Sequence, residues 1–265
     1  MTSIALTIAG SDSSGGAGIQ ADLKTFSALG VYGASVVTAL TAQNTQGVRA
    51  IHDVPPDFVR RQMDAVLSDI AVDAIKIGML SNPAIIEVVS DGLADFDQLP
   101  IVLDPVMVAT SGDALLTSQA IAVLKDTLMQ RADIITPNLH EAAVLTGLPM
   151  ATNDDAIEKQ ARLMLDFGVR AVLLKGGHGG GDEARDFYCD EGVSFWLSAP
   201  RFETQNTHGT GCTLSSAIVA GLAKKQTVRD ALNTAKQYVT GAIKGADELS
   251  IGKGHGPTHH FHDVW

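Results

Sequence analysis

Short apolar runs rich in valine, isoleucine and leucine alternate along the chain with longer stretches that have helical periodicity. Strands buried on both faces carry continuous rather than alternating hydrophobic residues, so these runs predict a mostly parallel sheet. The predicted strands are residues 4–9, 35–42, 74–77, 101–103, 133–136 and 171–174. The predicted helices are residues 19–29, 56–69, 83–94, 117–128, 138–146, 154–167, 213–224 and 228–246. A helix follows a strand almost throughout, which indicates an α/β fold with helices on both faces of the sheet.

Two further apolar segments, residues 185–190 and 193–197, predict a small antiparallel hairpin at one edge of the sheet. Glu191 and Gly192 lie between them and favour a turn. We find no long linker, repeat or low-complexity tract, so we expect a single domain over residues 1–265. Ligands of open α/β sheets bind beyond the carboxyl ends of the strands, and the glycine-rich and polar loops of this chain follow the predicted strands.

The composition limits the classes of partner. The chain of 265 residues has a net charge of −11, which argues against nucleic acid or an anionic membrane surface as the main partner. The negative charge of an anionic substrate then has to be stabilised locally by helix N-termini, a lysine or a metal ion. Cys189 and Cys212 are the two cysteines, too few for a disulfide framework, and they fit a reducing compartment. The N-terminus lacks the basic region of a signal peptide, so we expect a cytoplasmic protein.

A loop of glycines and small polar residues, 206–213, leads directly into a predicted helix. The backbone N–H groups around Gly209, Thr210 and Gly211 can converge on an anion at the positive end of that helix. Cys212 stands at the head of the helix, where the dipole favours negative charge and can lower the pKa of a thiol. The pattern predicts a phosphate-handling site, with an ordinary glycine turn and a structural cysteine as the alternative.

The loop after the first predicted strand is also rich in glycine. Residues 16–21 match the relaxed dinucleotide fingerprint, so an NAD-dependent oxidoreductase is an alternative. However, the turn is long, and the second strand ends in Gln43 and Asn44 instead of an acid that would bind a ribose. We favour a glycine-rich rim over a small ligand, with Asp22 one helical turn beyond Gly18 and able to reach back toward it. Otherwise Asp22 merely complements the helix dipole.

An amide and a thioether follow two of the predicted strands. The side chain of Gln43 offers a donor and an acceptor, which suit the edge of a nitrogen heterocycle, although a polar turn would also use it. Met79 can cover a flat ring, although core packing is the commoner fate of such a residue. These two positions predict a binding site for a small heteroaromatic molecule.

Two acids and a lysine follow later strands. Asp104 and Glu141 are hard oxygen ligands that can hold Mg²⁺ through water, as in nucleotide sites. Glu141 also completes a capping box with Asn138 as the N-cap, and the two roles are compatible. Lys175 can meet a nucleotide phosphate while the glycine-rich residues 176–181 fold over it. The alternative is a solvated lysine beside a flexible surface loop.

The C-terminal tail, residues 252–262, contains four histidines and three glycines. It lacks cysteine partners and helical spacing, so we expect it to dock against the body of the protein near the active site instead of forming a dedicated zinc site.

Together these motifs resemble the hydroxymethylpyrimidine and phosphomethylpyrimidine kinases of thiamine biosynthesis, within the ribokinase-like superfamily. The motifs that carry the resemblance are residues 9–12, 15–22, 42–45, 76–79, 136–138 with Glu141, 175–178, 206–213, and 252–254 with 259–262 in the tail. They cover essentially the whole chain. The resemblance implies a three-layer ribokinase-like fold and ATP-dependent phosphorylation of 4-amino-5-hydroxymethyl-2-methylpyrimidine, followed by a second transfer onto the monophosphate.

The resemblance also implies roles for particular residues. Gln43 would bind the pyrimidine edge, and the rest of that pocket would consist of Gly10, Asp22, Met79 and Val106. Asp104 and Glu141 would organise Mg²⁺, and Lys175 and Asn138 would lie on the ATP side. Gly209, Thr210 and Gly211 would form the anion hole for the transferring group, with Thr210 also on the ATP side. Related kinases suggest a homodimer.

Cys212 departs from the broader superfamily, because sugar kinases usually place an aspartate base there. Phosphoryl transfer has a loose transition state in most analyses, so a strong base is not essential. Cys212 would either accept the alcohol proton as a thiolate or position the alcohol by hydrogen bonding. Two further alternatives remain: a pyridoxine or pyridoxal kinase of the same superfamily, and a cysteine hydrolase that uses Cys212 with His208 but has no evident orienting acid.

Overall fold

The computed structural model describes residues 2–107, 116–176 and 181–265 of the chain. Within these ranges nine strands form one sheet in the order β3-β2-β1-β4-β5-β6-β7-β8-β9. The strands are β1 (Ile4–Asp12), β2 (Tyr32–Asn44), β3 (Gly47–Asp53), β4 (Ala74–Ile77), β5 (Ile101–Leu103), β6 (Ile134–Ile135), β7 (Ala171–Lys175), β8 (Glu183–Asp190) and β9 (Ser194–Pro200). The strands from β2 through β1 to β7 in this order are parallel, whereas β3, β8 and β9 pair antiparallel at the two edges.

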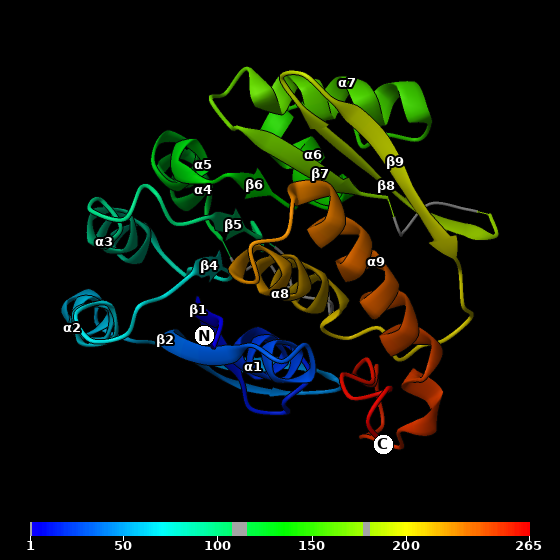
Figure 1. Cartoon of the computed structure of the whole chain (residues 1–265), viewed down its shortest axis with the longest axis horizontal. Helices are drawn as coiled ribbons and strands as arrows, with labels where there is room; N and C mark the ends of the chain where they lie inside the picture. Colours follow the sequence, from blue (N-terminus) through cyan, green and yellow to red (C-terminus); the bar gives the residue numbers. More distant parts are fainter. Residues whose placement is uncertain (1, 108–115, 177–180) are drawn as a thin grey trace.

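Helices cover both faces of the sheet (Figure 1). One face carries α2 (Pro56–Leu67), α3 (Pro83–Gly92), α4 (Ser118–Asp126), α5 (Leu128–Arg131), α6 (Leu139–Thr146) and α7 (Asp154–Leu165). The other face carries α1 (Gly18–Ala28), α8 (Thr210–Ala223) and α9 (Val228–Lys244), and a short 3₁₀ turn, η1 (Ala246–Glu248), follows α9. Two buried apolar clusters fill the two interfaces, as a three-layer architecture requires. The predicted three-layer α/β fold is therefore confirmed.

All six predicted parallel strands and the predicted edge hairpin are present. Strands β4 and β5 have the predicted bounds, and the others have shifted ends. Strand β3 was not predicted, because residues 49–53 are all exposed at the sheet edge and contain no continuous hydrophobic run. The helix predicted over residues 117–128 is interrupted at Thr127, which leaves helical geometry between α4 and α5. Helix α8 begins at Thr210, three residues earlier than expected.

The topology brings the predicted loops to one edge of the sheet. The parallel strands end in or just before the polar positions Asp12, Gln43, Asp104 and Lys175, and the carboxyl ends of parallel strands meet at the same edge. Helix α8 lies against β1, β4 and β5, so its first turn meets that edge. A search of the described ranges finds no helix that is both long and apolar enough to cross a membrane.

Candidate active site

A buried ion pair lies at the centre of this edge. Lys175, the last residue of β7, donates from Nζ to Oδ1 of Asp104 over 2.8 Å. Thr136 donates to the same oxygen over 3.1 Å, and Ser215 of α8 donates to Oδ2 over 3.3 Å. Burial opposes the charge on Asp104, but Lys175 and Lys76 outweigh it and lower its pKa. Burial likewise opposes the charge on Lys175, yet Asp104 raises its pKa, so both partners are ionised at neutral pH.

Glu141 lies beside this pair as part of the predicted capping box, which is confirmed. The Asn138 side chain accepts from the Glu141 amide over 2.9 Å, and Glu141 Oε2 accepts from the Asn138 amide over 2.8 Å. The Glu141 side chain is buried, and burial raises its pKa to about 7, with Lys175 opposing the rise and Asp104 adding to it. The charge of this carboxyl group therefore changes near physiological pH.

The loop before α8 approaches the ion pair closely. Gly209 is the N-cap of α8 with φ of 80°, and a side chain there would collide with the Gly16 carbonyl. A methyl group at Gly211 would lie 3.3 Å from Nζ of Lys175. The Thr210 amide donates to the Thr207 carbonyl over 3.2 Å and the Thr213 amide to the Gly209 carbonyl over 2.9 Å. The amides of Gly211 and Cys212 are therefore the donors that this positive helix end can present next to Lys175. Of the loop at 176–181 that we expect to fold over a nucleotide, residues 177–180 lie outside the described residues.

Cys212 lies at the third helical position of α8, where we expected the helix end to lower the pKa of its thiol. Burial raises its pKa to about 11 even though Lys76 opposes the rise and the Gly18 amide donates to the sulfur. The predicted lowering of this pKa by the helix end is therefore wrong, because desolvation of the thiolate exceeds the stabilisation by Lys76 and the Gly18 amide. The thiol is protonated at neutral pH. Positioning of the alcohol by Cys212 stays a prediction.

A thiol of this kind should react slowly with alkylating reagents. At pH 7.5 we expect iodoacetamide to modify Cys212 on the order of 100-fold more slowly than a free cysteine, because only the thiolate is nucleophilic. Mass spectrometry of the peptide that contains Cys212, over a range of pH, measures this rate. Cys212→Ser identifies the modified peptide. Rapid alkylation at pH 7.5 would show that the thiolate is present after all.

Asp22 does not reach back toward Gly18 as expected. It is fully buried and accepts hydrogen bonds from the hydroxyl groups of Thr7 over 2.6 Å and Ser216 over 2.7 Å. Nζ of Lys76 donates to both carboxylate oxygens of Asp22, over 2.9 and 3.0 Å. Asp22 thus has no exposed surface to offer a ligand. Burial opposes the charge on Lys76, but the pairing with Asp22 raises its pKa. Sequence reasoning assigned Lys76 no role, although a lysine inside a four-residue buried strand is a signal for a buried ion pair.

On the opposite side of the α8 loop, Gln43 lies next to His208. Their Nε2 atoms are 3.3 Å apart, and Nε2 of His208 is 2.8 Å from Oδ2 of Asp12. Burial opposes the charge on Asp12, but hydrogen bonds from His208, Ser14 and backbone amides outweigh it and lower its pKa to about 2. Asp12 was another residue that sequence reasoning did not single out. His208, considered there as the partner of Cys212, is held by this aspartate.

The remaining predicted pocket residues also follow strand ends. A methyl group at Gly10 would lie 3.3 Å from Sδ of Met79, so these two residues are in contact across β1 and the loop after β4. Val106 is half-buried in the loop that begins at Asp104. The structure therefore brings together Gly10 with Met79, and Asp104 with Lys175 and Glu141.

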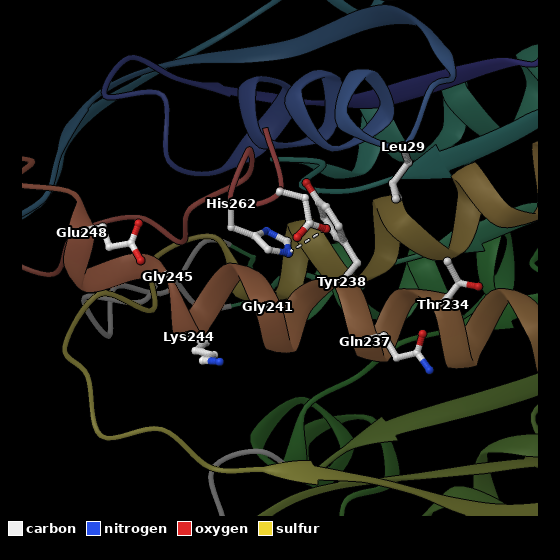
Figure 2. A pocket seen from close by; sticks show the side chains of 10 residues that line it. Leu29, Thr234, Gln237, Tyr238, Gly241, Lys244, Gly245, Glu248 and His262 are labelled. Carbon is white, nitrogen blue, oxygen red and sulfur yellow. Dashed lines mark ion pairs between the residues drawn. The ribbon is translucent and has the colours of Figure 1, made fainter. Parts of the chain in front are cut away.

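A surface hollow of about 580 Å³ lies elsewhere, between α9, the end of α1 and the tail (Figure 2). Its lining includes Leu29, Tyr238, Lys244 and His262, and it contains none of the predicted site residues. We therefore place the candidate active site at the strand ends.

Comparisons with known proteins identify the family of the chain. A family model described as phosphomethylpyrimidine kinase matches residues 12–259. The chain is 56% identical to a hydroxymethylpyrimidine/phosphomethylpyrimidine kinase of Rhizobium meliloti, with 100% of this chain and 99% of the relative covered. A phosphomethylpyrimidine kinase structure from Clostridium difficile is 44% identical, with a TM-score of 0.80 over 91% of this chain and 99% of the other. A Bacillus subtilis pyridoxal kinase in complex with ADP is 37% identical, with a TM-score of 0.90 over 98% of each chain. The chain therefore belongs to the phosphomethylpyrimidine kinase family and is a phosphotransferase.

Proposed function

We propose that the protein transfers the γ-phosphoryl group of ATP to the hydroxymethyl group of 4-amino-5-hydroxymethyl-2-methylpyrimidine, and then to the resulting monophosphate, in thiamine biosynthesis. The observation that carries this proposal is the identity of 56% over the whole chain to a kinase with both names. Membership of a kinase family also decides against the NAD-dependent oxidoreductase and the cysteine hydrolase.

In this proposal the acceptor lies between two groups of residues. Gln43 binds the edge of the pyrimidine, while Gly10, Met79 and Val106 enclose the ring. The amides of Gly211 and Cys212 at the head of α8 and the Lys175 ammonium stabilise the charge that spreads over the γ-phosphoryl oxygens. A bond forms from the alcohol oxygen to phosphorus as the bond to the ADP oxygen breaks, and the alcohol proton passes to an oxygen of the transferring phosphoryl group or to water. Asp22 acts indirectly, because its side chain is enclosed by Lys76, Thr7 and Ser216.

Asp104 and Glu141 fit a Mg²⁺ ion bound with ATP. Mg²⁺ usually takes one or two carboxylates and completes its shell with water and phosphate oxygens. When bound, Mg²⁺ would neutralise phosphate charge. Asn138 and Thr210 remain our proposed contacts on the ATP side.

The second transfer requires that the same site accept an additional phosphate. The first product presents its phosphate toward the position that its hydroxyl group occupied before, so the head of α8 and Lys175 again face the developing charge. Release and rebinding of the monophosphate in the same orientation would suffice.

The second candidate function is pyridoxal kinase, which the similarity to the Bacillus subtilis structure favours. The test is mass-spectrometric analysis of products formed from ATP and Mg²⁺ with either the hydroxymethylpyrimidine or pyridoxal. We expect pyrimidine mono- and diphosphate. Pyridoxal phosphate as the main product would move the protein to the second function, and no phosphorylated product from either would contradict both.

We further propose a homodimer, a cytoplasmic location and a single domain over residues 1–265. The single domain is supported by one sheet whose strands run from Ile4 to Pro200. The homodimer is supported by exposed apolar side chains at one edge of the sheet, Leu40 of β2, Ile51 of β3 and Phe58 of α2. Sedimentation measurements test the oligomeric state.

A further inference from the structure

The C-terminal tail docks on the body of the protein as expected, and its glycines show how closely (Figure 1). We call residues 252–260 the strap. A side chain at Gly252 would collide with the Thr45 side chain, and one at Gly254 would collide with the Thr45 carbonyl. A side chain at Gly256 would collide with the Asn206 side chain. Every second residue from 252 to 256 is a glycine that faces the body, so the backbone itself makes the contact.

One end of the strap is attached to the turn between β2 and β3. Thr45 Oγ1 accepts hydrogen bonds from the amides of Lys253 over 3.2 Å and Gly254 over 3.1 Å. The Thr45 carbonyl accepts from the His255 amide over 2.9 Å. Three successive strap amides therefore converge on one residue. Gln43, the proposed pyrimidine ligand, lies two residues before it.

The other end of the strap is attached to the loop before α8. The Gly256 amide donates to Asn206 Oδ1 over 3.0 Å, and the His208 amide donates to the Gly256 carbonyl over 3.0 Å. His260 Nε2 is 3.1 Å from Thr213 Oγ1, whose hydroxyl donates to the Gly209 carbonyl over 2.8 Å. Gly209 is the N-cap of α8 and the first glycine of the proposed anion hole. Thr258 and His260 are buried, so this end is enclosed by the body.

We propose that the strap is a positioning element for phosphoryl transfer, with Thr45 as its anchor on the acceptor side. This inference rests on the proposed function. The strap joins the turn next to Gln43 to the loop that forms the head of α8, so it sets the separation between the acceptor alcohol and the anion hole. Transfer rates depend steeply on such separations, and a misplacement of about 1 Å can cost about 10²-fold. Thr45 and His260 act through their neighbours and need not touch either substrate.

The test compares Thr45→Val with Thr45→Ser. Valine keeps the shape of threonine but removes the oxygen that two strap amides use, whereas serine keeps that oxygen. We expect Thr45→Val to lower kcat with the hydroxymethylpyrimidine by about 10-fold and to change the KM for ATP by less than about twofold. Thr45→Ser should stay near the wild type. Lys253→Ala is a matched control, because that side chain is exposed and only its backbone amide bonds to Thr45.

Hydrogen exchange gives a readout that does not depend on turnover. Thr45→Val should accelerate exchange of the His208 amide, which lies at the other end of the strap, and Thr45→Ser should not. The inference is overturned if Thr45→Val has the kcat and the His208 exchange rate of the wild type, or if Thr45→Ser loses as much activity. If the wild type phosphorylates no pyrimidine, the proposed function fails, and unchanged exchange at His208 would still overturn the strap inference separately.

Discussion

Replacing Lys175 with methionine should lower kcat/KM for phosphoryl transfer by about 10³-fold. Losses of this size follow the removal of a preorganised hydrogen-bond donor that stabilises developing charge in the transition state. Methionine keeps most of the side-chain volume but removes the ammonium group that faces Asp104 and the head of α8. Steady-state kinetics with ATP and the hydroxymethylpyrimidine measure the change. The same substitution should raise the pKa of Glu141 further, because Lys175 is the group that opposes its rise.

The substitution also removes the partner of a buried carboxylate. Breaking a buried pair costs about 3–5 kcal/mol when one charge is left uncompensated. We expect less here, because Thr136 and Ser215 still donate to Asp104. Denaturant titration therefore has to accompany the kinetics. Lys159→Met, which removes an exposed lysine of α7, is the matched control. A second variant, Lys175→Arg, keeps the positive charge at the site. A Lys175→Met enzyme that folds and retains kcat/KM within about threefold would contradict the assigned role.

Local patterns predicted β1 and β4 to β7 because these strands are mostly buried on both faces, as with the four buried residues of β4. The exposed edge strand β3 has no such pattern, so only its pairing with β2 defines it. The early start of α8 depends on Gly209 at positive φ against the Gly16 carbonyl, a contact between segments far apart in sequence. Hydrophobic periodicity carries no information about that contact.

In the candidate site, too, local sequence patterns predict some residues, whereas contacts between distant segments determine others. Asp104 and Lys175 were predictable because each stands at the end of a predicted strand, and parallel strands end at one edge. Their partners were not predictable in the same way. Lys76 pairs with Asp22 across 54 residues, and His208 pairs with Asp12 across 196 residues. The pKa of Cys212 was predicted with the wrong sign, because the helix dipole is visible in the sequence whereas the burial of the thiol is not.

Glu141 provides the second large effect, through pH. Its pKa in the folded protein is about 7 against 4.5 for an unperturbed glutamate, so the folded state holds this proton at higher pH than the unfolded state. Stability should therefore fall as pH rises from about 4.5 to about 7, by at most about 3 kcal/mol from this group. Glutamine cannot ionise, but it can still accept the Asn138 amide of the capping box. Between pH 5 and pH 8, Glu141→Gln should gain stability relative to the wild type, and denaturant titrations at both pH values measure this gain.

Activity should change in the opposite direction. A carboxylate that helps to hold Mg²⁺ is useful only when ionised, so we expect the wild type to need less Mg²⁺ for half-maximal turnover as pH rises through about 7. Glu141→Gln should need about 10- to 100-fold more Mg²⁺ at pH 8, with little dependence on pH. Glu87→Gln, which removes an exposed glutamate of α3, is the control for a change in net charge. If Glu141→Gln is more stable but needs more Mg²⁺ for half-maximal turnover, the buried carboxyl group lowers stability and contributes to binding of the metal nucleotide. Parallel stability curves and equal Mg²⁺ requirements for the variant and the wild type would instead leave Glu141 as a helix cap alone.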